Sequence, residues 1–162
     1  MHQVFLEIGG NIGNKHDNFN KVYKFIKNEL GKIIKKSSIY ETPPWGFDAK
    51  DNFWNQVLLI ETEFSPVELL QKIAEIENWF GRKRESGKYN SRQMDIDILY
   101  FDELVTETEN LTIPHPQIQN RRFVLVPLVD IAPEFVHPLL GMNSLLLLEN
   151  CPDSSLIKKV EL

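Results

Sequence analysis

The chain has 162 residues, of which 42% are hydrophobic, and this length suits a single domain that buries a core of its own. Its formal net charge of −5 at pH 7 argues against a general nucleic-acid-binding protein, because such proteins gain affinity from Lys and Arg side chains that neutralise phosphates. The lone cysteine, Cys151, excludes an internal disulfide and a cysteine-based zinc site, and no apolar run predicts a signal peptide or a membrane span, so we expect a soluble, cytoplasmic protein without a membrane partner.

The first part of the chain alternates the signals of strands and helices. Residues 4–8 predict a short strand, and the turn 9–14 leads into a helix that Asp17 can cap and Gly31 can end. The tetrapeptide Ser-Pro-Val-Glu at 65–68 is a capping box with proline at the first helical position, and it predicts the start of a second helix. Runs rich in β-branched and aromatic residues predict three further strands, at 33–40, 53–62 and 94–101.

The order of these elements predicts the fold class. Strand, helix, strand, strand, helix, strand is the βαββαβ order of a ferredoxin-like α+β sandwich, with an antiparallel sheet and helices on one face. A C-terminal extension follows, in which we expect an extended run at 111–114, a strand at 123–129 and a short helix at 144–149. No repeat, linker or low-complexity tract marks a boundary, so we expect one domain over residues 1–162.

The segment that opens the last of these strands carries the clearest chemistry. A strand sends alternate side chains to opposite faces, so Asp95 and Asp97 point to the same side. Two carboxylates in this arrangement form an all-oxygen site suited to Mg²⁺. The preceding loop contributes cations that could hold the phosphates bridged by such a metal: Arg82, Lys83, Arg84 and Lys88. The pattern indicates phosphoryl-type transfer, although the solvated face of a half-buried strand can look the same.

Two proline-containing segments add aromatic and basic side chains. Trp45 in the loop 40–47, with the later Phe53, Asn55 and Phe123, would suit a planar heterocycle that is stacked on its faces and read along its edge. His115 with Arg121 could cradle a triphosphate. The plainer interpretations are core aromatics and a histidine in a rigid turn. The glycine turn 9–15 is not followed by Gly-Lys-Ser/Thr, so a simple strand-to-helix turn is favoured over a phosphate loop.

In their order and spacing, these segments resemble the 6-hydroxymethyl-7,8-dihydropterin pyrophosphokinase family. The matching motifs cover nearly the whole chain: the Gly-Gly-Asn turn, Thr42-Pro43-Pro44-x-Gly46, Asn55, Gly81-Arg82-x-Arg84, Arg92-x-x-Asp95-x-Asp97-Ile98, Pro114-His115 and Asn120-Arg121-x-Phe123. The resemblance implies a ferredoxin-like fold and transfer of diphosphate from ATP to the hydroxymethyl group of 6-hydroxymethyl-7,8-dihydropterin, with release of AMP, in folate biosynthesis. We also expect a monomer, and the net charge already argues against a nucleic-acid partner.

The resemblance gives each matching residue an expected role. Asp95 and Asp97 would hold two Mg²⁺ ions, and Arg82 and Arg92 would close over the reaction. Nucleotide-contacting positions are matched by Glu77, Arg84, Lys88, Tyr89, Ile98, Thr112, His115 and Arg121. Pterin-binding positions, with the ring between the two phenylalanines, are matched by Thr42, Pro43, Pro44, Trp45, Gly46, Phe53, Asn55 and Phe123.

The chain departs from the family pattern in two places. Residues 88–92 read Lys-Tyr-Asn-Ser-Arg where the family often has Arg-Trp-Gly-Pro-Arg, and a lysine cannot grip a phosphate bidentately as arginine does. We expect this to change the geometry of the loop more than the function. Gly10 stands where serine is common, which we expect to be a minor change.

Two other functions would use some of the same residues. A nucleotidyl- or glycosyltransferase could use Asp-x-Asp to hold a metal-nucleotide, but it would not explain the Thr-Pro-Pro-x-Gly loop together with the aromatic residues. A ferredoxin-like RNA-binding module could use its open sheet face and the basic loop. That function predicts sheet aromatics in an RNA-recognition pattern, which the sequence lacks.

Overall fold

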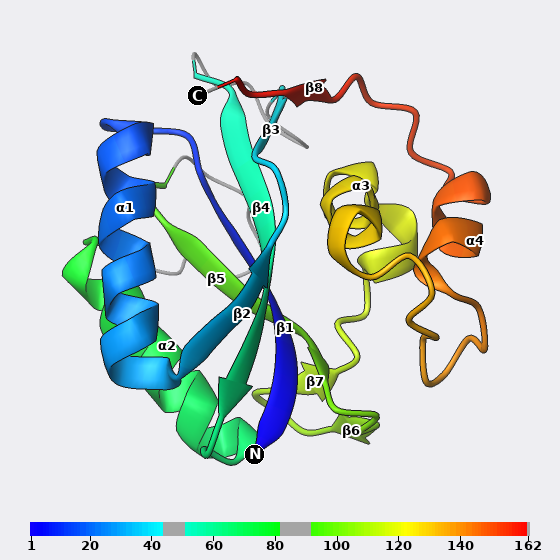
Figure 1. Ribbon diagram of the computed structural model, residues 1–162, viewed down its shortest axis with the longest axis horizontal. Coiled ribbons are helices and arrows are strands. Elements are labelled where there is room, and N and C mark those ends of the chain that lie inside the picture. The colour runs from blue at the N-terminus through cyan, green and yellow to red at the C-terminus, as the bar shows by residue number, and fades with distance from the viewer. Residues whose placement is uncertain (44–50, 82–91, 162) are drawn as a thin grey trace.

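In the computed structural model, which describes residues 1–43, 51–81 and 92–161, the centre of the molecule is an antiparallel sheet (Figure 1). Its strands are β1 (His2–Gly10), β2 (Lys32–Lys36), β3 (Tyr40–Thr42), β4 (Phe53–Thr62), β5 (Asp95–Phe101) and β8 (Lys158–Lys159). β1 lies between β5 and β4, while β2 and β3 both pair with the other edge of β4. The predicted strand 33–40 is therefore interrupted, since its last residue already belongs to β3.

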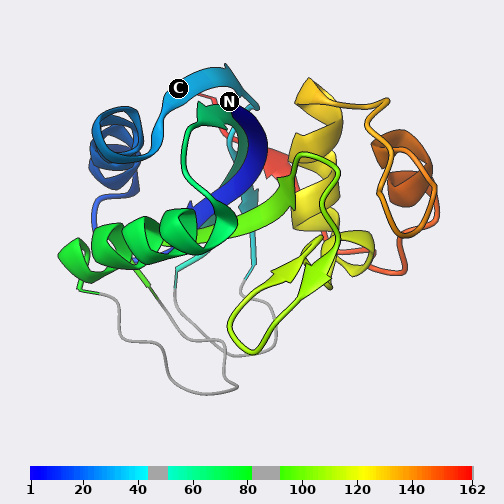
Figure 2. The same ribbon diagram turned by 90° about the horizontal axis from the view of Figure 1, so that it is seen from below.

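Two helices cover one face of this sheet, as Figures 1 and 2 show from two directions. α1 (Lys15–Phe25) continues as a π-helical turn (Ile26–Leu30), and α2 (Pro66–Trp79) runs between β4 and β5. Their buried side chains join those of the sheet in one cluster that includes Leu6, Ile8, Phe19, Ile26, Ile60, Leu69 and Ile96. This confirms the predicted βαββαβ sandwich.

The C-terminal extension covers part of the second face. There α3 (Arg122–Ile131) packs on the sheet and the short α4 (Ser144–Glu149) packs on α3. Their buried side chains join those of the sheet in a second cluster: Phe5, Val57, Leu59, Leu99, Tyr100, Ile118, Val124, Leu125, Leu128 and Leu147. The Tyr40 hydroxyl donates to the Asp130 carboxylate at 2.6 Å, which ties the end of α3 to β3. Between β5 and α3 the chain forms the small β6 (Thr106–Glu107) and β7 (Thr112–Ile113) pair.

The strand predicted at 123–129 is wrong, because these residues form α3. The run of β-branched and aromatic residues suggested a strand, yet the residues buried against the sheet, Val124, Leu125 and Leu128, follow helical spacing. Pro127 lies inside the helix, where it removes one backbone donor. Packing of this apolar stripe onto the sheet has overridden local propensity.

The helix ends test the capping predictions. Asn14, not Asp17, caps α1, since the Asn14 side chain accepts a hydrogen bond from the Asp17 N–H at 3.1 Å. The capping box of α2 is confirmed, with the Ser65 N–H donating to Glu68 and the Glu68 N–H donating to the Ser65 hydroxyl. Within the described residues, none of the helices is long and apolar enough to cross a membrane.

Candidate active site

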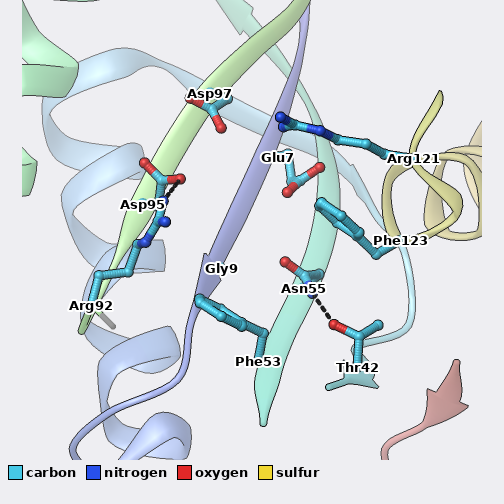
Figure 3. A pocket seen from close by; sticks show the side chains of 10 residues that line it. All are labelled: Glu7, Gly9, Thr42, Phe53, Asn55, Arg92, Asp95, Asp97, Arg121 and Phe123. Carbon is cyan, nitrogen blue, oxygen red and sulfur yellow. Dashed lines mark hydrogen bonds and ion pairs between the residues drawn. The ribbon is translucent and has the colours of Figure 1, made fainter. Parts of the chain in front are cut away.

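A pocket lies where β1, β3, β4 and β5 meet the segment that begins α3 (Figure 3). It contains about 440 Å³ of space between the protein atoms, including the open solvent at its mouth. Its lining residues are Glu7, Gly9, Thr42, Phe53, Asn55, Arg92, Asp95, Asp97, Arg121 and Phe123. All of them except Glu7 and Gly9 are among the residues that the sequence assigns to a site. Residues far apart in the chain are thus brought to one place.

The register of the sheet explains this convergence. Gly9 in β1 is paired with Asn55 in β4 on one side and with Asp95 in β5 on the other. One strand period further along β1, Glu7 is paired with Asp97. Because alternate residues of a strand share a face, the residues at these positions line the same pocket. The predicted common orientation of Asp95 and Asp97 is confirmed.

Asp95 and Asp97 form the acidic end of the pocket. The Arg92 guanidinium donates to the Asp95 carboxylate at 2.6 Å, and both side chains are largely buried, with 8% and 16% exposed. In the described part of the chain no group of three or more His, Cys, Asp or Glu residues forms a metal site. Mg²⁺ is commonly bound through one or two carboxylates together with substrate phosphates, so this donor set fits that ion.

Glu7 is a third pocket carboxylate, and sequence reasoning missed it. Burial raises the pKa of Glu7 well above its usual value of 4.5, and the nearby charges of Asp97 and Asp95 raise it further, against the lowering effect of Arg121 and Arg92. No motif marks this position. A glutamate inside the apolar run Val-Phe-Leu-Glu-Ile was nevertheless a signal, because charged residues are rarely buried in such runs without a purpose.

We expect Glu7→Gln to stabilise the metal-free protein at neutral and alkaline pH. A carboxyl whose pKa is raised by folding destabilises the fold as pH rises from about 4.5 through the folded-state pKa, and a tenfold change in proton affinity is worth about 1.4 kcal/mol. Urea unfolding in the presence of a chelator, from pH 4 to pH 9, should show that the gain in the free energy of unfolding of Glu7→Gln over the wild type grows with pH. The exposed Glu63→Gln is the control. If the free energies of unfolding of the wild type and of Glu7→Gln change with pH in parallel, folding does not raise the pKa of Glu7.

Two aromatic rings form walls of the pocket, and an arginine side chain lies close to each ring. The Arg92 guanidinium carbon lies 5.6 Å from the ring centroid of Phe53, and that of Arg121 lies 5.7 Å from the ring centroid of Phe123. Burial lowers the pKa of Arg121, while the charge of Glu7 acts in the opposite direction. The pocket therefore combines two stacking surfaces with two cations.

Asn55 and Thr42 form the amide and hydroxyl end of the pocket. Both are almost fully buried, and the Asn55 amide donates to the Thr42 hydroxyl at 3.2 Å. Gly9 makes room for this arrangement, because a Cβ at that position would lie 2.7 Å from the Asn55 side-chain oxygen. A side chain that can both donate and accept is thereby held at the floor beside the aromatic walls.

Five of the described residues with an expected role do not line the pocket: Pro43, Glu77, Ile98, Thr112 and His115. Glu77 projects from α2 and accepts the backbone N–H of Ile96 at 2.9 Å, so it holds β5 from the opposite face. Ile98 belongs to the core under α1 and α2. Burial lowers the pKa of His115, and the charge of Asp95 raises it. His115 is thus close enough to Asp95 to experience its charge.

The remaining predicted residues, Pro44, Trp45, Gly46, Arg82, Arg84, Lys88 and Tyr89, lie outside the described residues.

Comparison with known proteins gives matches over most of the chain. Residues 5–133 match the family described as 7,8-dihydro-6-hydroxymethylpterin-pyrophosphokinase. The chain is 39% identical to a 2-amino-4-hydroxy-6-hydroxymethyldihydropteridine pyrophosphokinase of Aquifex aeolicus, over 86% of each protein.

Other matches are parts of longer proteins. A folic acid synthesis protein of Dictyostelium discoideum is 36% identical over 97% of this chain, which spans 24% of that relative. Among solved structures, wild-type HPPK-DHPS of Plasmodium falciparum with pteroate has a TM-score of 0.75 at 16% identity, covering 91% of this chain and 44% of the other. That likeness supports the fold. The chain spans about a quarter of the Dictyostelium protein and under half of the Plasmodium one.

Proposed function

The chain belongs to the 7,8-dihydro-6-hydroxymethylpterin-pyrophosphokinase family, and we propose that its pocket performs pyrophosphoryl transfer from ATP to a hydroxymethyl dihydropterin, a step of folate biosynthesis. The observation that supports this most is the meeting of paired carboxylates, two arginines and two phenylalanines in one pocket (Figure 3). The hydroxymethyl oxygen attacks the β-phosphorus of ATP, and the bond from that phosphorus to the α–β bridging oxygen breaks. AMP leaves with the bridging oxygen, and the proton of the hydroxymethyl group is released.

The aromatic end of the pocket would bind the heterocycle. Phe53 and Phe123 offer ring faces for stacking, and Asn55, positioned by Thr42, would read the polar edge of the pterin. A buried amide discriminates well, because a ligand that fails to pair with it leaves a polar group unsatisfied.

The charged end of the pocket would bind the triphosphate. Asp95 and Asp97 would hold two Mg²⁺ ions, which when bound supply neutralisation of the charge on the transferred group. Arg92 and Arg121 approach the same space from opposite walls, so they can contact phosphate oxygens from two sides. No covalent intermediate is required, since positioning and charge stabilisation can supply most of the rate.

Release of AMP tests this proposal directly. Incubation of the protein with ATP, Mg²⁺ and the hydroxymethyl dihydropterin should release one AMP for each pterin consumed, and a chelator should stop the reaction. Recovery of ADP would indicate ordinary kinase chemistry. Turnover that does not depend on the pterin would contradict the assignment.

We further propose that the protein works in the cytoplasm as a monomer with one domain over residues 1–162, on small-molecule substrates and without a nucleic-acid partner. Size-exclusion chromatography with light scattering should give the mass of one chain. The mass of two chains would contradict the monomer.

Substitutions at the aromatic end should separate the two ligands. We expect Phe123→Ala and Asn55→Ala to weaken pterin binding by about 1–3 kcal/mol each, because each removes a stacking surface or a buried polar partner, while ATP binding changes little. Calorimetric titration of each ligand measures both effects. Phe64→Ala, which removes a half-buried ring outside the pocket, is the control. Equal losses for pterin and ATP would point to general damage of the fold.

A further inference from the structure

The Gly-Gly-Asn turn after β1 carries a buried polar side chain next to the pocket. Asn11 is 1% exposed and lies just beyond the strand that supplies Gly9 to the pocket floor. Polar side chains buried to this degree are nearly always hydrogen-bonded, so their partners indicate what they hold in place.

One set of partners belongs to Arg92. The Arg92 backbone N–H donates to the Asn11 side-chain oxygen at 2.8 Å, and the Arg92 carbonyl accepts the backbone N–H groups of Asn11 and Ile12 at 2.9 and 3.3 Å. Both polar backbone groups of Arg92 are therefore bound to this turn, although the two segments are 81 residues apart in the chain.

Gly10 permits this close approach. A Cβ at position 10 would lie 2.2 Å from the carbonyl oxygen of Gln93 and 3.2 Å from that of Arg92, so any side chain there would push the Arg92 segment away. The glycine that we expected to be a minor departure from serine is thus a condition of the contact as this chain makes it.

A second partner leads to the opposite wall of the pocket. The Asn11 side-chain amide donates to the carbonyl of Asp51 at 3.2 Å, just before β4 and Phe53. Asparagine has a donor and an acceptor on one short side chain, and here each end holds a different segment. Asn11 therefore holds both the backbone of Arg92 and the segment before Phe53. This agrees with the 5.6 Å between the Arg92 guanidinium carbon and the Phe53 ring centroid.

We propose that Asn11 is a positioning residue for the reaction, which fixes the backbone of Arg92 and sets its guanidinium between Asp95 and the Phe53 wall. This inference rests on the proposed function, in which Arg92 acts on the transferred phosphates. A displacement of about 1 Å in such a group can cost roughly 100-fold in rate. Asn11 touches neither substrate in this role. Its side-chain oxygen acts on the chemical step through Arg92, while its side-chain amide holds the segment before Phe53.

Kinetics of Asn11→Ala test the functional half of the inference. We expect kcat to fall roughly 10- to 100-fold, with the KM for ATP changed less than about twofold. In the Arg92→Ala background the same substitution should have no further effect on kcat, because the group that it positions is gone. Asn18→Ala is the matched control: Asn18 is buried and donates to the Ile12 carbonyl of the same turn, so its loss disturbs the turn without removing a bond to Arg92. It should retain most of the turnover.

Amide hydrogen exchange at Arg92, followed by NMR without substrates, tests the structural half. Loss of the bond to the Asn11 side chain should speed exchange of the Arg92 amide at least about fivefold in Asn11→Ala and leave it unchanged in Asn18→Ala. Unchanged exchange in Asn11→Ala, or multiplicative losses of kcat in the double variant, would overturn the inference. If amide exchange at Arg92 differs between the wild type and the variants as expected, but the wild type releases no AMP, the proposed function is overturned and the contact between Asn11 and Arg92 is not. The two failures are therefore distinguishable.

Discussion

Turnover should fall about 1,000-fold or more in Asp97→Ala, while the protein stays folded. A metal carboxylate contributes several kcal/mol of charge stabilisation, and each ~1.4 kcal/mol is about tenfold in rate. The stability should not fall with the activity, because Asp97 is the leading charged neighbour that raises the pKa of Glu7, and its removal relieves that repulsion. Metal binding should weaken together with turnover. AMP release at saturating Mg²⁺, Mn²⁺ binding by calorimetry and thermal unfolding measure turnover, metal binding and stability in turn.

Asp95→Ala should behave like Asp97→Ala in turnover and metal binding. Asp17→Ala, an exposed aspartate in the first turn of α1, is the control and should keep near-normal turnover. If both pocket variants kept near-normal turnover and bound Mn²⁺ as the wild type does, the two aspartates would be no more than the polar face of β5.

The second large effect is expected at Arg92. Arg92→Ala should slow the chemical step by about 10³–10⁵, the range for arginines that stabilise charge on a transferred phosphoryl group, while ATP affinity changes much less. Single-turnover rates with both substrates, beside equilibrium titration of ATP, separate the two quantities. Arg92→Lys should recover only part of the rate, because a lysine keeps the charge and loses the planar bidentate grip.

Arg122→Ala provides the matched control for Arg92. Arg122 is the first residue of α3, and its guanidinium donates to the carbonyl of Ser155 at 3.0 Å, outside the pocket. Its replacement removes a half-buried, hydrogen-bonded arginine without removing a cation from the site. An Arg92→Ala enzyme with an unchanged chemical step would show that the ion pair with Asp95 serves stability alone.

Some features could be predicted because they follow a short local period, and others because the chain resembles a known family. The two-residue repeat of β5 was enough to place Asp95 and Asp97 on one face, whereas the assignment of Phe53, Asn55 and Phe123 to a common site came from the resemblance to the pyrophosphokinase family. The capping box of α2 was predictable from a local pattern, since its two hydrogen bonds join residues three apart.

The features that the sequence did not predict depend on contacts between segments that lie far apart in the chain. The apolar run 123–129 has no period that separates a strand from a buried helix, and its packing against Val57 and Leu99 decided for α3. The role of Glu7 required knowledge that Asp97, 90 residues later in the chain, is its paired neighbour in the adjacent strand. Asn11 reads as one residue of an ordinary turn until the backbone of Arg92 lies against it.

The register of β1 sets the distance between the two ends of the pocket. Asn55 and Asp95 both lie opposite Gly9, so their backbones are separated by two strand spacings, roughly 9–10 Å, whatever the side chains around them do. A heterocycle that pairs with Asn55, as proposed, would therefore lie at a distance from the carboxylates that the strand pairing sets. In the proposed function, the sheet itself would therefore set the distance between the heterocycle and the carboxylates, and substitutions in the loops would not change it.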